Sequence, residues 1–216
     1  MPVAIVTGAS KGFGLALSRA LAERGWHLAV DARDAEALKT ANFGTNVTVV
    51  PGDVTDPAHR AELVQAVGQL DLLVNNASAL GPSPLPALAE YPLDQFVKVY
   101  QANVVAPLAL IQLALPLLCK GDGIVVNVSS DAAVEAYEGW GGYGSSKAAL
   151  DRLSAVLGVE RPELRVYAFD LGDMRTGMHQ AAFPGEDISG RPEPATVVPA
   201  LLKLIDERPA SGRYTK

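Results

Sequence analysis

The sequence is poor in the residues from which proteins build disulfides, metal centres and cationic surfaces. It has a single cysteine, Cys119, in an apolar run, so no internal disulfide can form and a buried structural thiol is expected. The three histidines, His27, His59 and His179, lack ligand-like spacing, which argues against a metal site. The 18 basic and 24 acidic residues give a formal net charge of -6, which offers no support for nucleic-acid binding.

Targeting segments and long hydrophobic runs are also lacking. The first eight residues resemble a strand, without the basic region and cleavable apolar stretch of a signal peptide. The most apolar stretch, 102–119, contains two prolines and falls short of the roughly 20 residues that a bilayer span needs. We therefore expect a buried helix there, no membrane partner, and a cytoplasmic location.

The chain has instead short apolar runs that alternate with helix-like patterns. Its 216 residues, of which 49% are hydrophobic, fit a single domain over 1–216. Six runs read as buried parallel strands: Val3–Val6, Leu28–Val30, Val47–Val50, Leu72–Val74, Ile124–Val128 and Val166–Phe169. Helices are expected between them, over 15–24, 58–68, 94–118 and 143–157. This order predicts an α/β fold, a doubly wound parallel sheet of about six to seven strands with helices on both faces.

Two segments interrupt this alternation. Residues 81–92 are rich in proline and are expected to form a loop after the fourth strand, and residues 178–198 form an irregular segment after the sixth. Both would leave the carboxyl ends of strands, where open α/β sheets bind ligands. They could be ordinary surface loops, but their position favours a functional role.

A glycine-rich loop follows the first strand. Gly8, Gly12 and Gly14 stand between that strand and a predicted helix. Glycines permit a tight turn and a close backbone approach to a pyrophosphate, and the helix N-terminus supplies free N–H groups and a positive dipole end. Glycine triplets also occur in turns that bind nothing, so the prediction of a nucleotide site depends mainly on the strand before the loop and the helix after it.

Four polar residues could form one catalytic site: Asn103, Ser130, Tyr143 and Lys147. The last two are four apart, which places them on one face of a helix. An ammonium beside a phenol favours the phenolate and lowers the phenol pKa from about 10, as proton transfer near neutral pH requires. Each residue alone could have a structural role, as a helix tyrosine, a solvated lysine, a turn cap or a backbone-bonding amide.

The end of the second strand bears on which nucleotide would bind. An acid there would hold the ribose hydroxyls of NAD, whereas an arginine would accept the 2′-phosphate of NADP. The segment offers both Asp31 and Arg33, and the choice depends on strand register. Lys11, in the glycine loop, adds a second cation.

Together these motifs resemble the short-chain dehydrogenase/reductase family over nearly the whole chain. TGASKGFG resembles its cofactor loop, GDV at 52–54 its adenine-contacting motif, and NNA at 75–77 its motif after the fourth strand. Asn103 stands at the family's catalytic asparagine, and Ser130, thirteen residues before Tyr143, is preferred to Ser129 as the active serine. The resemblance implies these cofactor-binding residues: Gly8, Ser10, Lys11, Gly12, Phe13, Gly14, Arg33, Asp53, Val54, Asn76, Ala77, Tyr143, Lys147, Gly172, Met174 and Thr176.

The resemblance also implies a cofactor preference. It places Ala32 at the usual acidic position and Arg33 after it, which with Lys11 resembles the members that prefer NADP(H); NAD(H) stays possible. Asp31 would then face away from the ribose.

The chain departs from the family pattern at three places. Ser78 replaces a glycine, Leu171 replaces a proline that would fix the backbone φ, and the end of the chain, SGRYTK, is shorter than the family's usual tail. Because that tail often builds a tetramer interface, we expect a homodimer through the helices that carry Asn103 and Tyr143.

The resemblance implies reversible hydride transfer between NADP(H) and a small carbonyl or alcohol substrate. In the reductive direction Tyr143 would protonate the alkoxide, Lys147 would lower the Tyr143 pKa and hold the nicotinamide ribose, and Ser130 would donate to the carbonyl. Asn103 would hold a water that relays protons to Lys147. Two alternatives remain: a non-catalytic dinucleotide-binding or sensing protein on the same fold, and a methyltransferase with a similar sheet.

Overall fold

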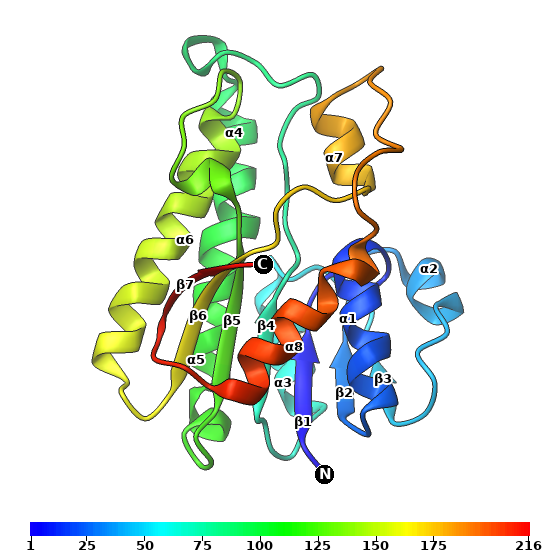
Figure 1. Cartoon of the computed structure of the whole chain (residues 1–216). Coiled ribbons are helices and arrows are strands. Elements are labelled where there is room, and N and C mark those ends of the chain that lie inside the picture. Colours follow the sequence, from blue (N-terminus) through cyan, green and yellow to red (C-terminus); the bar gives the residue numbers. More distant parts are fainter.

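The computed structural model describes all 216 residues and contains one parallel sheet of seven strands in the order β3-β2-β1-β4-β5-β6-β7 (Figure 1). All neighbouring strands pair in parallel, which confirms the doubly wound α/β prediction. The strands are β1 (Val3–Val6), β2 (His27–Val30), β3 (Val47–Val49), β4 (Leu72–Asn75), β5 (Ile124–Ser129), β6 (Arg165–Asp170) and β7 (Gly212–Thr215).

Helices cover both faces of the sheet, so every residue of the central strands β1, β4 and β5 is buried. Alternate residues of β1 belong to different cores: Ala4 and Val6 pack with α1 (Gly12–Glu23) and α8 (Val198–Glu207). Val3 and Ile5 pack in a second core with residues of α3 (Pro57–Gln65) and α5 (Ala106–Leu118). The period of two along the strand thus divides the apolar side chains between two helical layers.

The structure adds elements that the sequence patterns did not predict. The short helix α2 (Ala35–Thr40) begins at the N-cap Asp34, and α7 (Gly177–Ala182) lies inside the segment expected to be irregular. The C-terminal segment forms α8 and then β7, which pairs with β6 at the edge of the sheet. The longest helix, α6 (Gly141–Glu160), starts two residues before Tyr143.

One helical stretch combines three elements. α4 (Leu93–Tyr100) runs through a π-helical turn (Gln101–Val105) into α5. This 26-residue stretch, Leu93–Leu118, matches the helix expected over 94–118 and is apolar enough to cross a membrane by length and composition alone. Core helices pass the same test, and its buried face packs on the sheet, so the result is weak evidence for a membrane span.

Candidate active site

A cleft of about 1660 Å³ opens at the carboxyl ends of the strands. Its walls come from the glycine loop, the segments that follow β2, β4, β5 and β6, and the start of α6. Figure 1 shows α7 and its connections standing above this edge of the sheet. Except for Gly14 and Asn103, every predicted site residue lines the cleft.

The glycine loop is built for close backbone packing. Gly8 and Gly12 have φ values of 68° and 58°, which L-residues with side chains rarely adopt. A Cβ on Gly8 would lie 2.9 Å from the Cα of Ala77, and one on Gly14 would lie 2.5 Å from the carbonyl oxygen of Gly8. A side chain at either position would therefore displace the loop, whereas glycine keeps the backbone compact and its amides accessible.

Asn76 holds this loop from the neighbouring strand. Its Nδ2 donates to the carbonyl of Thr7 at 2.8 Å and to that of Gly8 at 3.2 Å. The Thr7 hydroxyl accepts in turn from the backbone N–H groups of Asn76 and Ala77, both at 3.0 Å. The motif after β4 thus fixes the shape of the loop after β1.

Asp31 lies beneath the loop and does not face the cleft as a free acid. It is 1% exposed; its Oδ1 accepts from the N–H of Gly8 at 2.8 Å, and its Oδ2 lies 2.9 Å from His59 Nε2. The hydrogen bond with Asp31 raises the pKa of His59 above its ordinary value. Sequence reasoning missed this pair because 28 positions separate the two residues. Arg33, by contrast, is exposed at the cleft.

Asn103 lies in the π-helical turn and is fully buried. Its Oδ1 accepts from Ser78 Oγ at 3.1 Å and from the N–H of Ala79 at 2.8 Å. Its Nδ2 donates to the Ala79 carbonyl and to Ser146 Oγ, both at 2.9 Å. The side-chain amide therefore has four partners that join the segment after β4 to α6. Pro107, four residues later, has no N–H, so the Asn103 carbonyl receives no regular α-helical hydrogen bond.

Ser130 follows β5 and caps a short turn. Its hydroxyl accepts from the N–H of Ala132 at 3.2 Å and donates to Asp131 Oδ1 at 2.9 Å. The neighbouring Ser129 has a buried hydroxyl with no hydrogen-bond partner. Of the two serines, Ser130 is the less buried.

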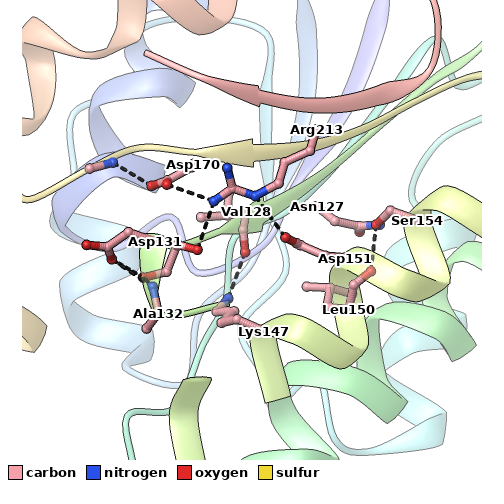
Figure 2. Close-up of polar contacts among 12 residues, drawn as sticks. Asn127, Val128, Asp131, Ala132, Lys147, Leu150, Asp151, Ser154, Asp170 and Arg213 are labelled. Carbon is pink, nitrogen blue, oxygen red and sulfur yellow. Dashed lines mark hydrogen bonds and ion pairs between the residues drawn. The ribbon is translucent and has the colours of Figure 1, made fainter. Parts of the chain in front are cut away.

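Tyr143 and Lys147 lie on the inner face of α6, as their spacing predicts. Lys147 is 1% exposed and donates from Nζ to the carbonyl of Val128 at 2.7 Å (Figure 2), 5.5 Å from the centre of the Tyr143 ring. Burial lowers the pKa of Lys147 to about 8.

The expected depression of the Tyr143 pKa is wrong for this structure. Burial raises that pKa, and the negative charges of Asp170 and Asp131 add to the increase, while the hydroxyls of Ser78 and Ser130 act against it. The physical reason is that desolvation outweighs the neighbouring groups, and Lys147 directs a proton to Val128 rather than to the phenol.

The segment after β6 is held by its own residues. Leu171 is 5% exposed and packs into the larger core, so burial anchors the position where a proline was expected. Gly172, with φ of 62°, donates from N–H to Asp170 Oδ1 at 2.9 Å. Thr176 caps α7 by accepting from the N–H of His179 at 3.2 Å, which leaves its hydroxyl hydrogen free to donate elsewhere.

The outer part of the cleft is largely apolar. The Trp140 ring lies 5.7 Å from that of Tyr143 and 5.9 Å from that of Phe183, centre to centre. His179, which sequence reasoning did not place in the site, contacts Phe183 with the two rings tilted and their centres 4.9 Å apart. Tyr137 and Met178 complete this region.

Comparisons with known proteins show what the whole chain is similar to. A family model described as short chain dehydrogenase matches residues 2–187. The chain is 38% identical over 174 residues to the rhamnolipid-biosynthesis 3-oxoacyl-[acyl-carrier-protein] reductase of Pseudomonas aeruginosa, an alignment that covers 73% of this chain and 66% of that relative. It is 33% identical over 201 residues to the sepiapterin reductase of Rattus norvegicus, covering 83% and 77% of the two chains.

A solved structure of a short chain dehydrogenase from Shigella flexneri complexed with NADP superposes with a TM-score of 0.92 at 30% identity, covering 99% of this chain and 95% of that one. An alcohol dehydrogenase from Thermococcus sibiricus complexed with 5-hydroxy-NADP superposes with a TM-score of 0.88 at 25% identity, covering 100% and 96%.

Proposed function

The chain belongs to the short-chain dehydrogenase/reductase family, and from that premise we propose that it transfers a hydride between NADP(H) and a small carbonyl or alcohol substrate. The observation that carries the proposal is the meeting of Ser130, Tyr143 and Lys147 in the same cleft as the glycine loop. When bound, the nicotinamide supplies the hydride. Family membership removes the methyltransferase alternative.

The residues around the cleft fit a dinucleotide. The glycine loop presents backbone N–H groups and the start of α1, whose N-cap Lys11 makes no side-chain capping hydrogen bond. Asp53, Val54, Ala77, Met174 and Thr176 would line the rest of the nucleotide path, as the family pattern implies.

NADP(H) is the preferred cofactor in this proposal. Asp31 is occupied by Gly8 and His59, so its carboxylate is not free to hold a ribose hydroxyl. Arg33 and Lys11 are exposed cations at the cleft and suit a 2′-phosphate. The Shigella flexneri structure, complexed with NADP, supports the same choice.

Tyr143 would give its proton to the alkoxide as the carbonyl is reduced. Its raised pKa keeps the phenol protonated at neutral pH, so the proton is in place, but efficient transfer requires that the phenolate be stabilised as it forms. Once the phenol ionises, the cation of Lys147 stabilises the phenolate, because opposite charges attract strongly in a buried site. Proton donation of this kind is worth about 10²–10⁴-fold in rate.

Ser130 and Asn103 would act beside this pair. The Ser130 hydroxyl can rotate its proton from Asp131 to the substrate oxygen and stabilise negative charge there. The side chain of Asn103 has all its partners, so a relay water would bind its backbone carbonyl rather than its amide.

A homodimer through α4, α5 and α6 is the proposed assembly. These helices lie side by side in Figure 1. They expose large apolar side chains. Leu93 is 79% exposed, Val97 55%, Leu113 43% and Val159 82%. Burying them in a partner would remove apolar surface from water. The cytoplasmic location stays a prediction.

A spectrophotometric screen tests the function. NADPH and NADH would be monitored at about 340 nm, the absorption band of reduced nicotinamide, with ketones, aldehydes and diketones. We expect substrate-dependent oxidation that is faster with NADPH. Tight NADPH binding without turnover on any carbonyl would instead support the non-catalytic binding or sensing alternative, for which Ser78 and Leu171 are the only sequence features.

A further inference from the structure

Arg213, on the C-terminal strand β7, connects three elements that carry the site (Figure 2). Its Nη2 donates to the carbonyl of Ser130 at 3.0 Å and to Asp170 Oδ2 at 2.9 Å. Its Nε donates to Asp151 Oδ2 at 3.1 Å. The guanidinium thus joins the segment after β5, the end of β6 and helix α6. No motif in the sequence predicts this role.

We propose that Arg213 is a positioning residue of the active site, which holds the backbone of Ser130 and the segment after β6 in register with the helix that bears Tyr143 and Lys147. The inference deepens the proposed hydride-transfer function and rests on it.

The first step of the argument is geometric. Asp170 uses both carboxylate oxygens: Oδ2 accepts from Arg213, and Oδ1 accepts from the N–H of Gly172 at 2.9 Å. Arg213 therefore fixes the first turn of the segment 171–176 through one intermediate side chain. Where a proline would restrict this backbone, the chain has Leu171, and the Arg213–Asp170–Gly172 chain of hydrogen bonds supplies an alternative restraint.

The second step is electrostatic. The side chains of Asp151 and Asp170 are only 15% and 9% exposed, and Arg213 is the one cation bonded to both. One oxygen of Asp151, Oδ1, is buried with no partner. Two carboxylates this close to the site need a cation, because buried unpaired charges are costly.

These carboxylates also act on the proton-transfer pair. Burial is the main cause of the raised Tyr143 pKa, and the charges of Asp170 and Asp131 add to it. Burial also lowers the Lys147 pKa, and the charge of Asp151 acts against that fall. Arg213 opposes both effects because its positive charge offsets Asp151 and Asp170. Removing the guanidinium would therefore raise both pKa values, besides loosening the backbone.

The test compares three variants. R213Q removes the charge, R213K keeps the charge but not the planar fork that reaches three partners, and R24Q is the matched control. Arg24 also forms an arginine–aspartate pair, 2.8 Å from Asp206 with side chains 40% and 52% exposed, but it lies outside the cleft. R24Q thus loses an ion pair without touching the site.

For R213Q we expect kcat to fall on the order of 10- to 100-fold, as small misplacements of catalytic groups produce. The KM for NADPH should rise as well, because Met174 and Thr176 of the loosened segment lie on the proposed nucleotide path. The alkaline limb of the kcat/KM profile for reduction should move to higher pH, because the proton donor holds its proton longer. R213K should keep the alkaline limb at the wild-type pH and recover part of the lost kcat. R24Q should match the wild type in kcat and in the pH profile.

A second readout needs no turnover. Gly172 donates its N–H to Asp170, so hydrogen exchange over 171–176 should be faster in R213Q than in R24Q or the wild type, with exchange over β1 unchanged. If the wild type turns over no carbonyl, the proposed function fails while this exchange measurement still decides whether Arg213 orders the segment. Unchanged exchange, or a folded R213Q with wild-type kcat and pH profile, would overturn the positioning role.

Discussion

On the side of β1–β3, the buried charges are paired with each other: Asp31 with His59, beneath the loop that Gly8 begins. On the side of β5–β7, charged groups surround the reacting groups: the buried Lys147, with one hydrogen bond and a lowered pKa, and the partly exposed Arg213 with its partners Asp151 and Asp170. We expect the β1–β3 side to bind the nucleotide through backbone amides and a close-packed loop. We expect the β5–β7 side to transfer protons to and from the substrate.

The two sides differ in the number of secondary-structure elements that form them. The glycine loop is fixed by its own conformation and by Asn76 from the adjacent strand. The catalytic side takes Ser130, Tyr143, Asp170 and Arg213 from four elements, so no single segment specifies it. Substitutions on the two sides should therefore separate nucleotide affinity from turnover.

The largest separation is expected from Tyr143→Phe. Removing the hydroxyl deletes the proposed proton donor, so kcat should fall about 10²–10⁴-fold, the range of general acid catalysis. The glycine loop is untouched, so the dissociation constant for NADPH, followed by fluorescence titration, should stay within about 3-fold, a difference below 1 kcal/mol. Full activity in this variant would refute Tyr143 as the donor, and an equal loss of affinity and turnover would remove the distinction between the two sides.

Gly8→Ala should produce the opposite pattern. Its Cβ would lie 2.9 Å from the Cα of Ala77, in addition to the cost of a side chain at φ of 68°. The loop must shift, so we expect NADPH affinity to fall about 10-fold or more, equivalent to at least 1.4 kcal/mol. With NADPH at saturation, kcat should fall much less.

Gly25→Ala is the matched control for this variant. Gly25 has φ of 81°, but a Cβ there has no atom within 4 Å, so only the backbone strain is shared. Both variants should lose a similar roughly 1–2 kcal/mol of unfolding free energy from that strain, with Gly8→Ala losing more because of the contact. Equal NADPH affinity in the two variants would show that the space around Gly8 is not needed for binding.

The two sides also differ in how far the sequence predicts them. The glycine loop, the six strands with continuous apolar runs and the Tyr143–Lys147 spacing are local patterns, because each depends on residues within one or two turns of chain. Two interactions depend instead on the assembled sheet, which brings distant segments together. They are the contact between Asp31 and His59 and the hydrogen bond from Arg213 to the carbonyl of Ser130, 83 positions away.

The remaining mismatches have physical reasons of the same kind. β7 is only half buried at the sheet edge, so its apolar pattern is weak. α8 has buried residues at helical spacing, Val198, Leu201, Leu204 and Ile205, but it follows an irregular segment and was not recognised as a separate helix. The predicted fall in the Tyr143 pKa failed because spacing on a helix says nothing about desolvation, which is set by packing around Trp140 and the surrounding cleft.

The smallest expected effect is on the nucleotide side, at His59. Its pKa is raised by Asp31, so the stabilisation from the charged pair is complete below the ordinary histidine value of about 6.5 and is lost as pH rises through the folded value. His59→Gln can still donate to Asp31 but cannot gain the charge. The wild type should therefore exceed the variant in unfolding free energy by more at pH 6 than at pH 9, by less than about 3 kcal/mol, the upper range for a hydrogen bond to a charged group.

Urea unfolding at the two pH values measures this difference, with His27→Gln, a histidine outside the pair, as the control. His59 packs against Gly52, where a Cβ would overlap its ring, so a small constant loss from imperfect packing should appear at both pH values and cancel in the comparison. A gap between wild type and His59→Gln that widens from pH 6 to pH 9 would mean that the buried Asp31 carboxyl, whose pKa burial raises, governs the pH dependence instead. A gap that stays the same would mean that the pair beneath the loop is held by packing rather than by charge. The two sides of the cleft would then differ in position but not in their electrostatics.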